Sequence, residues 1–153
     1  MEIHATDPGD PAMRPLIAGL EAEYRREYGD LTDGEMERHG PGEFRPPTGA
    51  MLVVVEGDET VAGGALRRWA DGIGEIKRMW TAPGHRRRGH ARRVLAALED
   101  AARGCGYRSV RLETGVRQRE AIALYLDVGY DPIDNYGRYA ESELCVSFEK
   151  RLA

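Results

Sequence analysis

The chain has 153 residues, of which 41% are apolar and 31% are charged, and its formal net charge is −4. This length suits one domain, 1–153, with a real core, and the composition is neither disordered nor fibrous. The negative balance argues against a chain built as a whole for nucleic acid. No apolar run resembles a signal peptide or reaches membrane length, and the two cysteines lack metal-ligand spacing. We therefore expect a cytoplasmic protein with reduced thiols, no metal and no membrane partner.

The first third of the chain predicts a strand, a helix and a loop. Residues 2–6 favour a short strand, and residues 12–29 favour an amphipathic helix, because apolar side chains recur at helical spacing. These are Met13, Leu16, Ile17, Leu20 and Tyr24. Residues 30–48 are rich in Gly and Pro, which predicts a loop, with one helical turn around 34–39. Acidic residues exceed basic ones from Glu21 to Glu43, and the loop from Asp30 to Glu43 could attract a cationic amine or could simply be solvated.

The middle of the chain predicts three consecutive strands. Residues 51–56 form an unbroken apolar run, as expected of a strand buried on both faces. A turn at 57–60 and a strand at 61–69 complete a hairpin signal. The next strand, 73–81, is expected to place alternate residues on opposite faces. One face would carry Glu75, Lys77, Met79 and Thr81, and the other Ile76, Arg78 and Trp80.

The second half alternates between helices and strands. A helix is expected from about Gly89 to Gly104 or Gly106, followed by a strand over 109–114 and a short helix from about Gln118 to Gly129. Residues 131–137 look irregular, and 144–149 alternate as a final strand. The predicted order is βα, then ββ, then βαβα, then β.

The stretch between the strand at 73–81 and the following helix has the features of an anion site. It contains Pro83, Gly84, three consecutive arginines and Gly89. The first turn of a helix offers amide N–H groups and the positive end of the helix dipole, which suit a phosphate or pyrophosphate. The alternative is a solvated basic helix start. The basic charge is local, since nine basic residues but only Asp71 and Glu75 lie between Arg67 and Arg93.

Two motifs together resemble those of the GNAT superfamily of acyl-CoA-dependent N-acyltransferases. Arg86-x-x-Gly89-x-Ala91 is similar to its pyrophosphate loop, and Ala121-x-x-Leu124-Tyr125 with Gly129-Tyr130 is similar to its later helix. The resemblance covers about 51–139, whereas the first 50 residues match only in element order. It implies an α/β (α+β) fold with a mixed, mostly antiparallel central sheet, a splayed parallel pair and flanking helices.

The resemblance also implies where acetyl-CoA would bind. The backbone of Met79 to Thr81 would pair with the pantetheine arm, and amides from Arg87 to Arg92 would hold the pyrophosphate with help from an arginine side chain. Gln118 stands where the family often has Asn. The expected cofactor residues are Met79, Trp80, Thr81, Arg86, Arg87, Arg88, Gly89, His90, Ala91, Arg92 and Gln118.

Three side chains are candidates for the chemistry. The resemblance implies that Tyr125 protonates the leaving thiolate, although a tyrosine at this spacing could equally be a core residue. Glu75 stands eleven residues before Arg86, the spacing at which some family members carry a base; otherwise it would pair with Lys77 or Arg78. Glu113, on the neighbouring strand, is the alternative base. His85 and His90 are expected to lie at the surface or to contact a phosphate. A metal is not expected, because no carboxylate or cysteine has the spacing of a metal ligand.

The resulting hypothesis is an N-acetyltransferase that moves an acetyl group to a primary amine of a small molecule or peptide by direct attack. The alternatives are a non-catalytic acyl-CoA-binding regulatory module and, against the charge balance, a nucleic-acid-binding domain. Dimers are common in such folds, and the final strand is one surface where two copies could pair into a homodimer.

Overall fold

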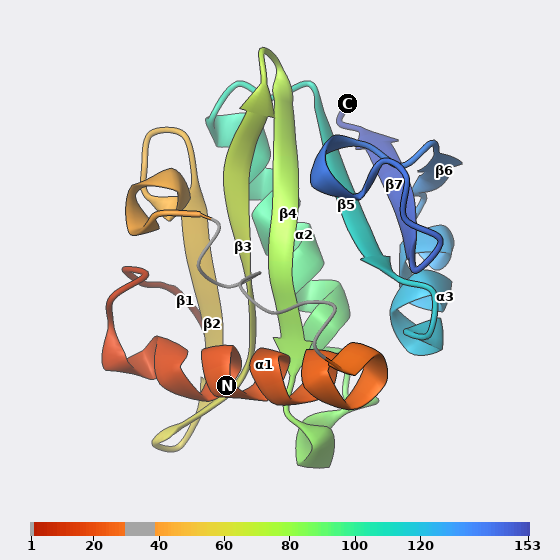
Figure 1. Ribbon diagram of the computed structural model, residues 1–153. Coiled ribbons are helices and arrows are strands. Elements are labelled where there is room, and N and C mark those ends of the chain that lie inside the picture. Colours follow the sequence, from red (N-terminus) through yellow and green to blue (C-terminus); the bar gives the residue numbers. More distant parts are fainter. Residues whose placement is uncertain (1, 30–38) are drawn as a thin grey trace.

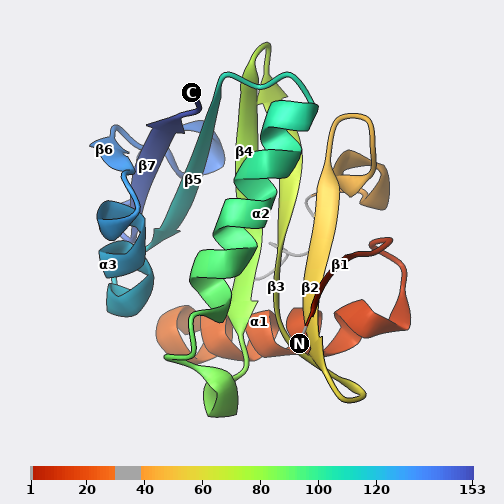
Figure 2. The same cartoon turned by 180° about the vertical axis from the view of Figure 1, so that it is seen from behind.

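The computed structural model describes residues 2–29 and 39–153, which form a seven-stranded sheet with helices on both faces (Figure 1). Helix α1 (Arg14–Tyr28) crosses one face. Helix α2 (His90–Gly104) covers the opposite face, with α3 (Arg119–Asp127) beside it (Figure 2). All three helices lie where the spacing of apolar residues predicts them. None of the helices among the described residues combines the length and apolar character needed to traverse a lipid bilayer.

The strand order in the sheet is β1-β2-β3-β4-β5-β7-β6. Every neighbouring pair is antiparallel except β4 and β5, which are parallel. This confirms the expected mixed, mostly antiparallel sheet with one parallel pair. The strands are β1 (Glu2–Ala5), β2 (Ala50–Glu56), β3 (Glu59–Ala70), β4 (Ile73–Thr81), β5 (Ser109–Gly115), β6 (Asp131–Ile133) and β7 (Cys145–Arg151).

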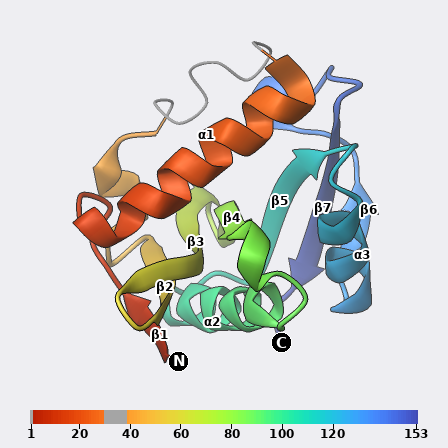
Figure 3. The same cartoon turned by 90° about the horizontal axis from the view of Figure 1, so that it is seen from below.

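Helices α1 and α2 lie on opposite sides of the sheet (Figure 3). Two hydrophobic clusters pack between the sheet and its helices. The larger cluster contains the apolar stripe of α2, formed by Val94, Leu95, Leu98 and Ala102. The smaller one lies under α1 and includes Leu16, Leu20, Phe44 and Trp80. Leu52 and Val54 of β2 belong to the first cluster, and Met51 and Val53 to the second. The apolar run in β2 is therefore buried on both faces, as predicted.

The predicted alternation along β4 is wrong from Arg78 onward, because the strand contains a bulge there. Gly63 pairs with Trp80 and Ala65 with Lys77, so two residues of β4 lie opposite Gly64. Arg78 has a positive φ of 58°, and its guanidinium lies over the Phe44 ring at 4.5 Å. Consequently, Ile76 packs in the cluster under α2, whereas Trp80 packs in the cluster under α1.

One further segment differs from the sequence-based expectation, and another lies largely outside the described residues. Residues 131–133 form β6 at the sheet edge, although their Asp and Pro suggested irregular structure; proline is tolerated on edge strands. The segment after α1 contains a 3₁₀ turn at Pro41–Phe44. The helical turn expected around 34–39, and most of the acidic loop, lie outside the described residues.

A buried ion pair joins β3 to β4. Arg67 and Glu75 are directly opposite in the antiparallel register, and their Nη1 and Oε1 atoms lie 2.8 Å apart. Glu75 is only 3% exposed, and its second carboxylate oxygen accepts a hydrogen bond of 2.8 Å from Tyr136 Oη. Arg67 also pairs with Glu43 at 2.8 Å. The carboxylate of Glu75 is therefore fully engaged inside the protein.

Replacing Arg67 by Met should lower the free energy of unfolding by about 3 kcal/mol, because Glu75 would stay buried without its counter-charge. Urea denaturation followed by circular dichroism measures this loss. Arg68→Met is the matched control: Arg68 pairs with the exposed Asp71, and exposed pairs contribute at most about 1 kcal/mol. Equal effects of the two substitutions would contradict a structural role for the Arg67–Glu75 pair.

Candidate active site

A cleft opens where the parallel strands β4 and β5 separate. Their pairing covers only Ile73–Glu75 and Ser109–Arg111. Beyond that point, a cleft of about 730 Å³ is lined by the ends of both strands, the loop before α2, and parts of all three helices. Tyr125, Gln118 and the expected cofactor residues of β4, Met79 to Thr81, all line it. The cleft thus brings together two motifs that are about 30 residues apart in the sequence.

The loop that leads into α2 forms one end of this cleft. It contains a 3₁₀ turn at Pro83–His85, and Gly89 precedes α2 with a left-handed φ of 81°. Arg87 also has a positive φ, of 64°. Within the described residues, no backbone carbonyl accepts a hydrogen bond from the amides of residues 86–92. These amides and the positive end of the α2 dipole make this loop suitable for an anion. We call residues 82–89, which lead into α2, the anion loop.

Acidic partners engage the arginine side chains of this loop. Arg86 donates to the Thr81 carbonyl at 3.3 Å and lies 3.8 Å from Glu23, while Arg87 lies 3.3 Å from Glu120. Arg92 pairs with Asp127 across to α3. Arg86, Arg87, Gly89, His90, Ala91 and Arg92 line the cleft, whereas the described lining does not include Arg88, which is directed to Glu56. The ion pairs of Arg87 and Arg92 are exposed, so an anionic ligand could displace them at little cost.

Tyr125 lies in the wall of the cleft with almost no exposure to solvent. Its ring packs against Tyr130 and Phe148, with centroids 5.8 and 5.9 Å away. Burial raises the pKa of its phenol, and the nearby carboxylate of Glu23 raises it further. The hydroxyl therefore keeps its proton at neutral pH and can donate it. Tyr125 is both a core residue and a wall of the cleft, so the two interpretations of it are compatible.

The two candidate bases occupy different environments. Glu75 does not belong to the described lining of the cleft, since Arg67 and Tyr136 hold its carboxylate. It pairs with neither Lys77 nor Arg78, because Arg67 lies opposite it in the sheet register. Glu113 lines the cleft and also a smaller adjoining pocket of about 120 Å³, and its carboxylate lies 3.7 Å from Lys77 Nζ.

Two polar side chains complete the cleft: Gln118, which was predicted from the sequence, and Glu23, which was not. Glu23 of α1 lines it and contacts both Arg86 and, at 3.5 Å, the amide of Gln118. Gln118 accepts hydrogen bonds from Thr114 and from the Gly115 amide, so it also closes the turn between β5 and α3. The helical spacing of α1 gave no reason to single out Glu23, because only the fold brings it to the anion loop.

Comparisons with known proteins agree with this geometry. The model of the acetyltransferase (GNAT) family matches residues 15–130. The IAA acetyltransferase of Azospirillum brasilense is 32% identical over 142 residues, which span 92% of this chain and 93% of that protein. A Klebsiella pneumoniae structure, assigned as an acyl-CoA N-acyltransferase, is 34% identical with a TM-score of 0.81, covering 99% of this chain and 97% of that one.

A third comparison concerns the fold alone. An aminoglycoside 6'-N-acetyltransferase complexed with coenzyme A is 16% identical, with a TM-score of 0.72, and the match covers 100% of this chain and 98% of that one. The arrangement of strands and helices around the cleft is thus shared with a protein that binds coenzyme A. The family model and the relatives above show that the chain belongs to the acetyltransferase (GNAT) family and is an acyltransferase.

Proposed function

We propose that this enzyme transfers an acetyl group from acetyl-CoA to a primary amine of a small molecule or peptide. The observation that carries the proposal is the cleft between β4 and β5, with Tyr125 in its wall and, at one end, the amides of residues 86–92, which bond to no backbone carbonyl of the described residues. In this proposal the amides from Arg87 to Arg92 hold the pyrophosphate, and the backbone of Met79 to Thr81 pairs with the pantetheine arm. Arg87 or Arg92 would exchange its carboxylate partner for a phosphate.

The smaller pocket is our proposed site for the amine. It shares Lys77, Glu113 and Gln118 with the main cleft, and it is lined further on by Tyr28 and Tyr139. Its volume of about 120 Å³ favours a small amine or the end of a chain. Glu43, the described end of the acidic loop, is already paired with Arg67. Attraction of a cationic amine would therefore fall to Glu113 and to the carboxylates of α1 rather than to Glu43.

The proposed reaction is a direct attack without a covalent enzyme intermediate. Glu113 takes a proton from the ammonium group, because only the neutral amine has a lone pair. The nitrogen then attacks the thioester carbonyl, and a backbone N–H near Met79 or Trp80 stabilises the oxyanion. The carbon–sulfur bond breaks as Tyr125 gives its proton to the sulfur, and the remaining excess proton of the attacking nitrogen restores the Tyr125 phenol, which leaves a neutral amide and the free thiol. We assign Glu75 a positioning role, because its carboxylate is held by Arg67 and Tyr136.

Thiol release from acetyl-CoA tests the function as a whole. The amine panel should include polyamines, amino sugars, amino-acid derivatives and peptide N-termini. It should also include an aminoglycoside, because the name of a similar protein mentions one, while IAA, which is not a primary amine, is tested separately because another name mentions it. Amine-dependent thiol release with at least one compound is expected. Tight acetyl-CoA binding without any turnover would favour the non-catalytic module instead.

Tyr125→Phe should lower kcat by about 100-fold, since general acid catalysis contributes at least this much. The affinity for coenzyme A, measured by calorimetry, should stay within twofold because the ring is retained. Burial raises the pKa of Tyr125 above its ordinary value of 10.0. The phenol therefore keeps its proton up to pH 10, and wild-type kcat should not fall between neutrality and pH 10. An alkaline loss of kcat below pH 9 that disappears in the variant would contradict the assignment.

Glu113→Gln should lower kcat by about 100-fold at neutral pH, and the loss should shrink as the pH approaches the pKa of the amine. Glu75→Gln is the comparison variant. Its main expected effect is on the free energy of unfolding, because the substitution removes the partner of Arg67. A kcat that falls with Glu75→Gln but not with Glu113→Gln, in protein that is equally folded, would restore Glu75 as the base.

Gly89→Ala tests the anion loop. A Cβ at this position meets no atom within 4 Å, so alanine would cause no clash. Holding alanine in the left-handed backbone conformation would cost about 1–2 kcal/mol. We expect coenzyme A to bind about tenfold more weakly, because that factor corresponds to about 1.4 kcal/mol. Gly84→Ala is the matched control: it also has open space and lacks a positive φ. Equal coenzyme A affinities in the two variants would argue against the loop as the pyrophosphate site.

A further inference from the structure

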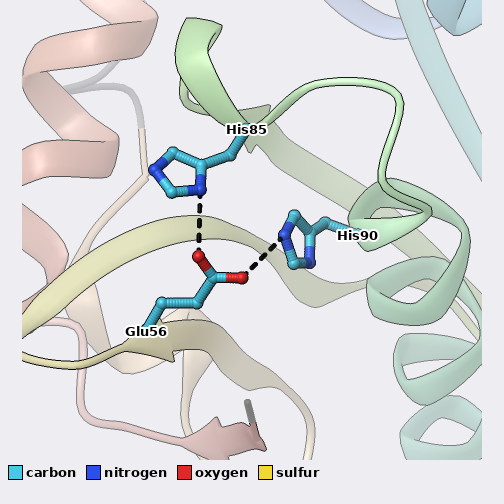
Figure 4. A group of neighbouring side chains, drawn as sticks. All are labelled: Glu56, His85 and His90. Carbon is cyan, nitrogen blue, oxygen red and sulfur yellow. Dashed lines mark ion pairs between the residues drawn. The ribbon is translucent and has the colours of Figure 1, made fainter.

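Three side chains from separate segments converge behind the anion loop. Glu56 lies at the end of β2, His85 in the 3₁₀ turn, and His90 at the first position of α2 (Figure 4). His85 Nδ1 lies 3.1 Å from Glu56 Oε2, and His90 Nε2 lies 3.4 Å from Glu56 Oε1. The three ligand atoms all lie within 4.8 Å of one another. The carboxylate that the sequence seemed to lack is supplied by a strand about 30 residues earlier.

His90 provides a second observation that points to a ligand. Its side chain is only 1% exposed, and its Nε2 atom points at Glu56 (Figure 4). Despite the short distance to Oε1, this Nε2 makes no hydrogen bond within the described residues. A buried polar nitrogen without a hydrogen bond costs about 1–3 kcal/mol. Such a nitrogen, aimed at a carboxylate and beside a second imidazole, is suited to bind a cation.

We propose that Glu56, His85 and His90 bind a divalent transition-metal ion of the zinc type. Two imidazole nitrogens and one carboxylate oxygen are a common set of zinc ligands, with a water in the fourth position. Ligand atoms about 2.0–2.1 Å from a tetrahedral ion would be separated by roughly the distances seen between Glu56 and each histidine. Little movement is therefore needed to complete the site.

The charges around the cluster show what the ion would replace. Arg88 lies 3.9 Å from Glu56 and 3.4 Å from His85 Nδ1, so the ion would take over as counter-charge of the carboxylate. Arg93 contacts His90 Nδ1 at 2.9 Å. Because arginine can only donate, this contact puts the proton of a neutral ring on Nε2. Metal binding would move that proton to Nδ1 and turn the exposed Arg93 side chain away.

The position of the cluster gives the ion a structural effect. His85 and His90 bracket residues 86–89, so the ion would fix both ends of this segment to β2. The amides proposed to hold the pyrophosphate belong to the same segment and the first turn of α2. We therefore expect the ion to tighten coenzyme A binding, a consequence that rests on the proposed function, whereas the metal site itself does not.

Zinc titration of tag-free protein, previously treated with a chelator, tests the site directly. A chromophoric zinc chelator serves as competitor, and one equivalent of zinc should bind. His85→Ala and Glu56→Gln should each weaken binding at least about tenfold. These two side chains are partly exposed, at 23% and 30%, so the variants should fold, and circular dichroism checks this. His4→Ala is the matched control, because His4 is exposed and lies 3.6 Å from Glu2; it should bind zinc as wild type does.

The site is overturned when folded wild-type protein binds no zinc, when His85→Ala and Glu56→Gln bind as tightly as wild type, or when His4→Ala loses as much affinity as they do. Cobalt substitution adds a spectroscopic check, since a tetrahedral site gives strong visible absorption that the two ligand variants should lose. Coenzyme A affinity with and without zinc tests the effect on the loop separately. Zinc binding in protein that transfers no acetyl group would leave the metal site standing and refute the proposed function.

Discussion

The separation of β4 from β5 beyond Glu75 and Arg111 is the constraint on which the site depends. Two parallel strands that stop pairing leave backbone groups that need other partners. The bulge at Arg78 alters the course of β4, and the turn closed by Gln118 ends β5. Lys77 and Glu113 then face each other across the gap at 3.7 Å. The cleft is thus a consequence of how the two strands end, not of the loops around it.

Buried charges stabilise the strands on either side of this gap. Tyr136, in the segment after β6, binds Glu75 on β4, and the guanidinium of Arg111 on β5 lies 4.8 Å from its ring. On the other face, Glu99 of α2 binds Lys150 of β7 at 3.0 Å and Tyr130 at 2.9 Å. The first network joins β4 to β5, and the second joins α2, which packs on β2, β3 and β4, to β7. The two halves of the sheet can therefore keep their relative position although the strands between them have parted.

The local features of the sequence predicted most of the fold. Helices α1 and α2 and strand β4 lie where apolar spacing and glycines indicated them, since these patterns act over a few residues. The bulge at Arg78 could not be predicted in this way, because it involves Phe44 and Gly64 from other elements. The hairpin register that makes Arg67 the partner of Glu75 depends on a second irregularity, between Arg68 and Ala70 near the turn. Similarly, Glu23 and Glu56 approach the anion loop only once α1 and β2 are in place.

The anion loop carries functional groups on both of its sides. On the side of the cleft, amides and arginines concentrate positive charge, which has to be balanced when no ligand is bound. Glu23, Glu120 and Asp127 provide part of that balance, and Glu56 provides it behind the loop. In our proposals, a pyrophosphate replaces the balancing carboxylates on the side of the cleft. Behind the loop, a divalent cation binds Glu56 and adds positive charge. The two ligands would then favour each other, because the pyrophosphate is negative, the cation is positive, and both bind the same short segment.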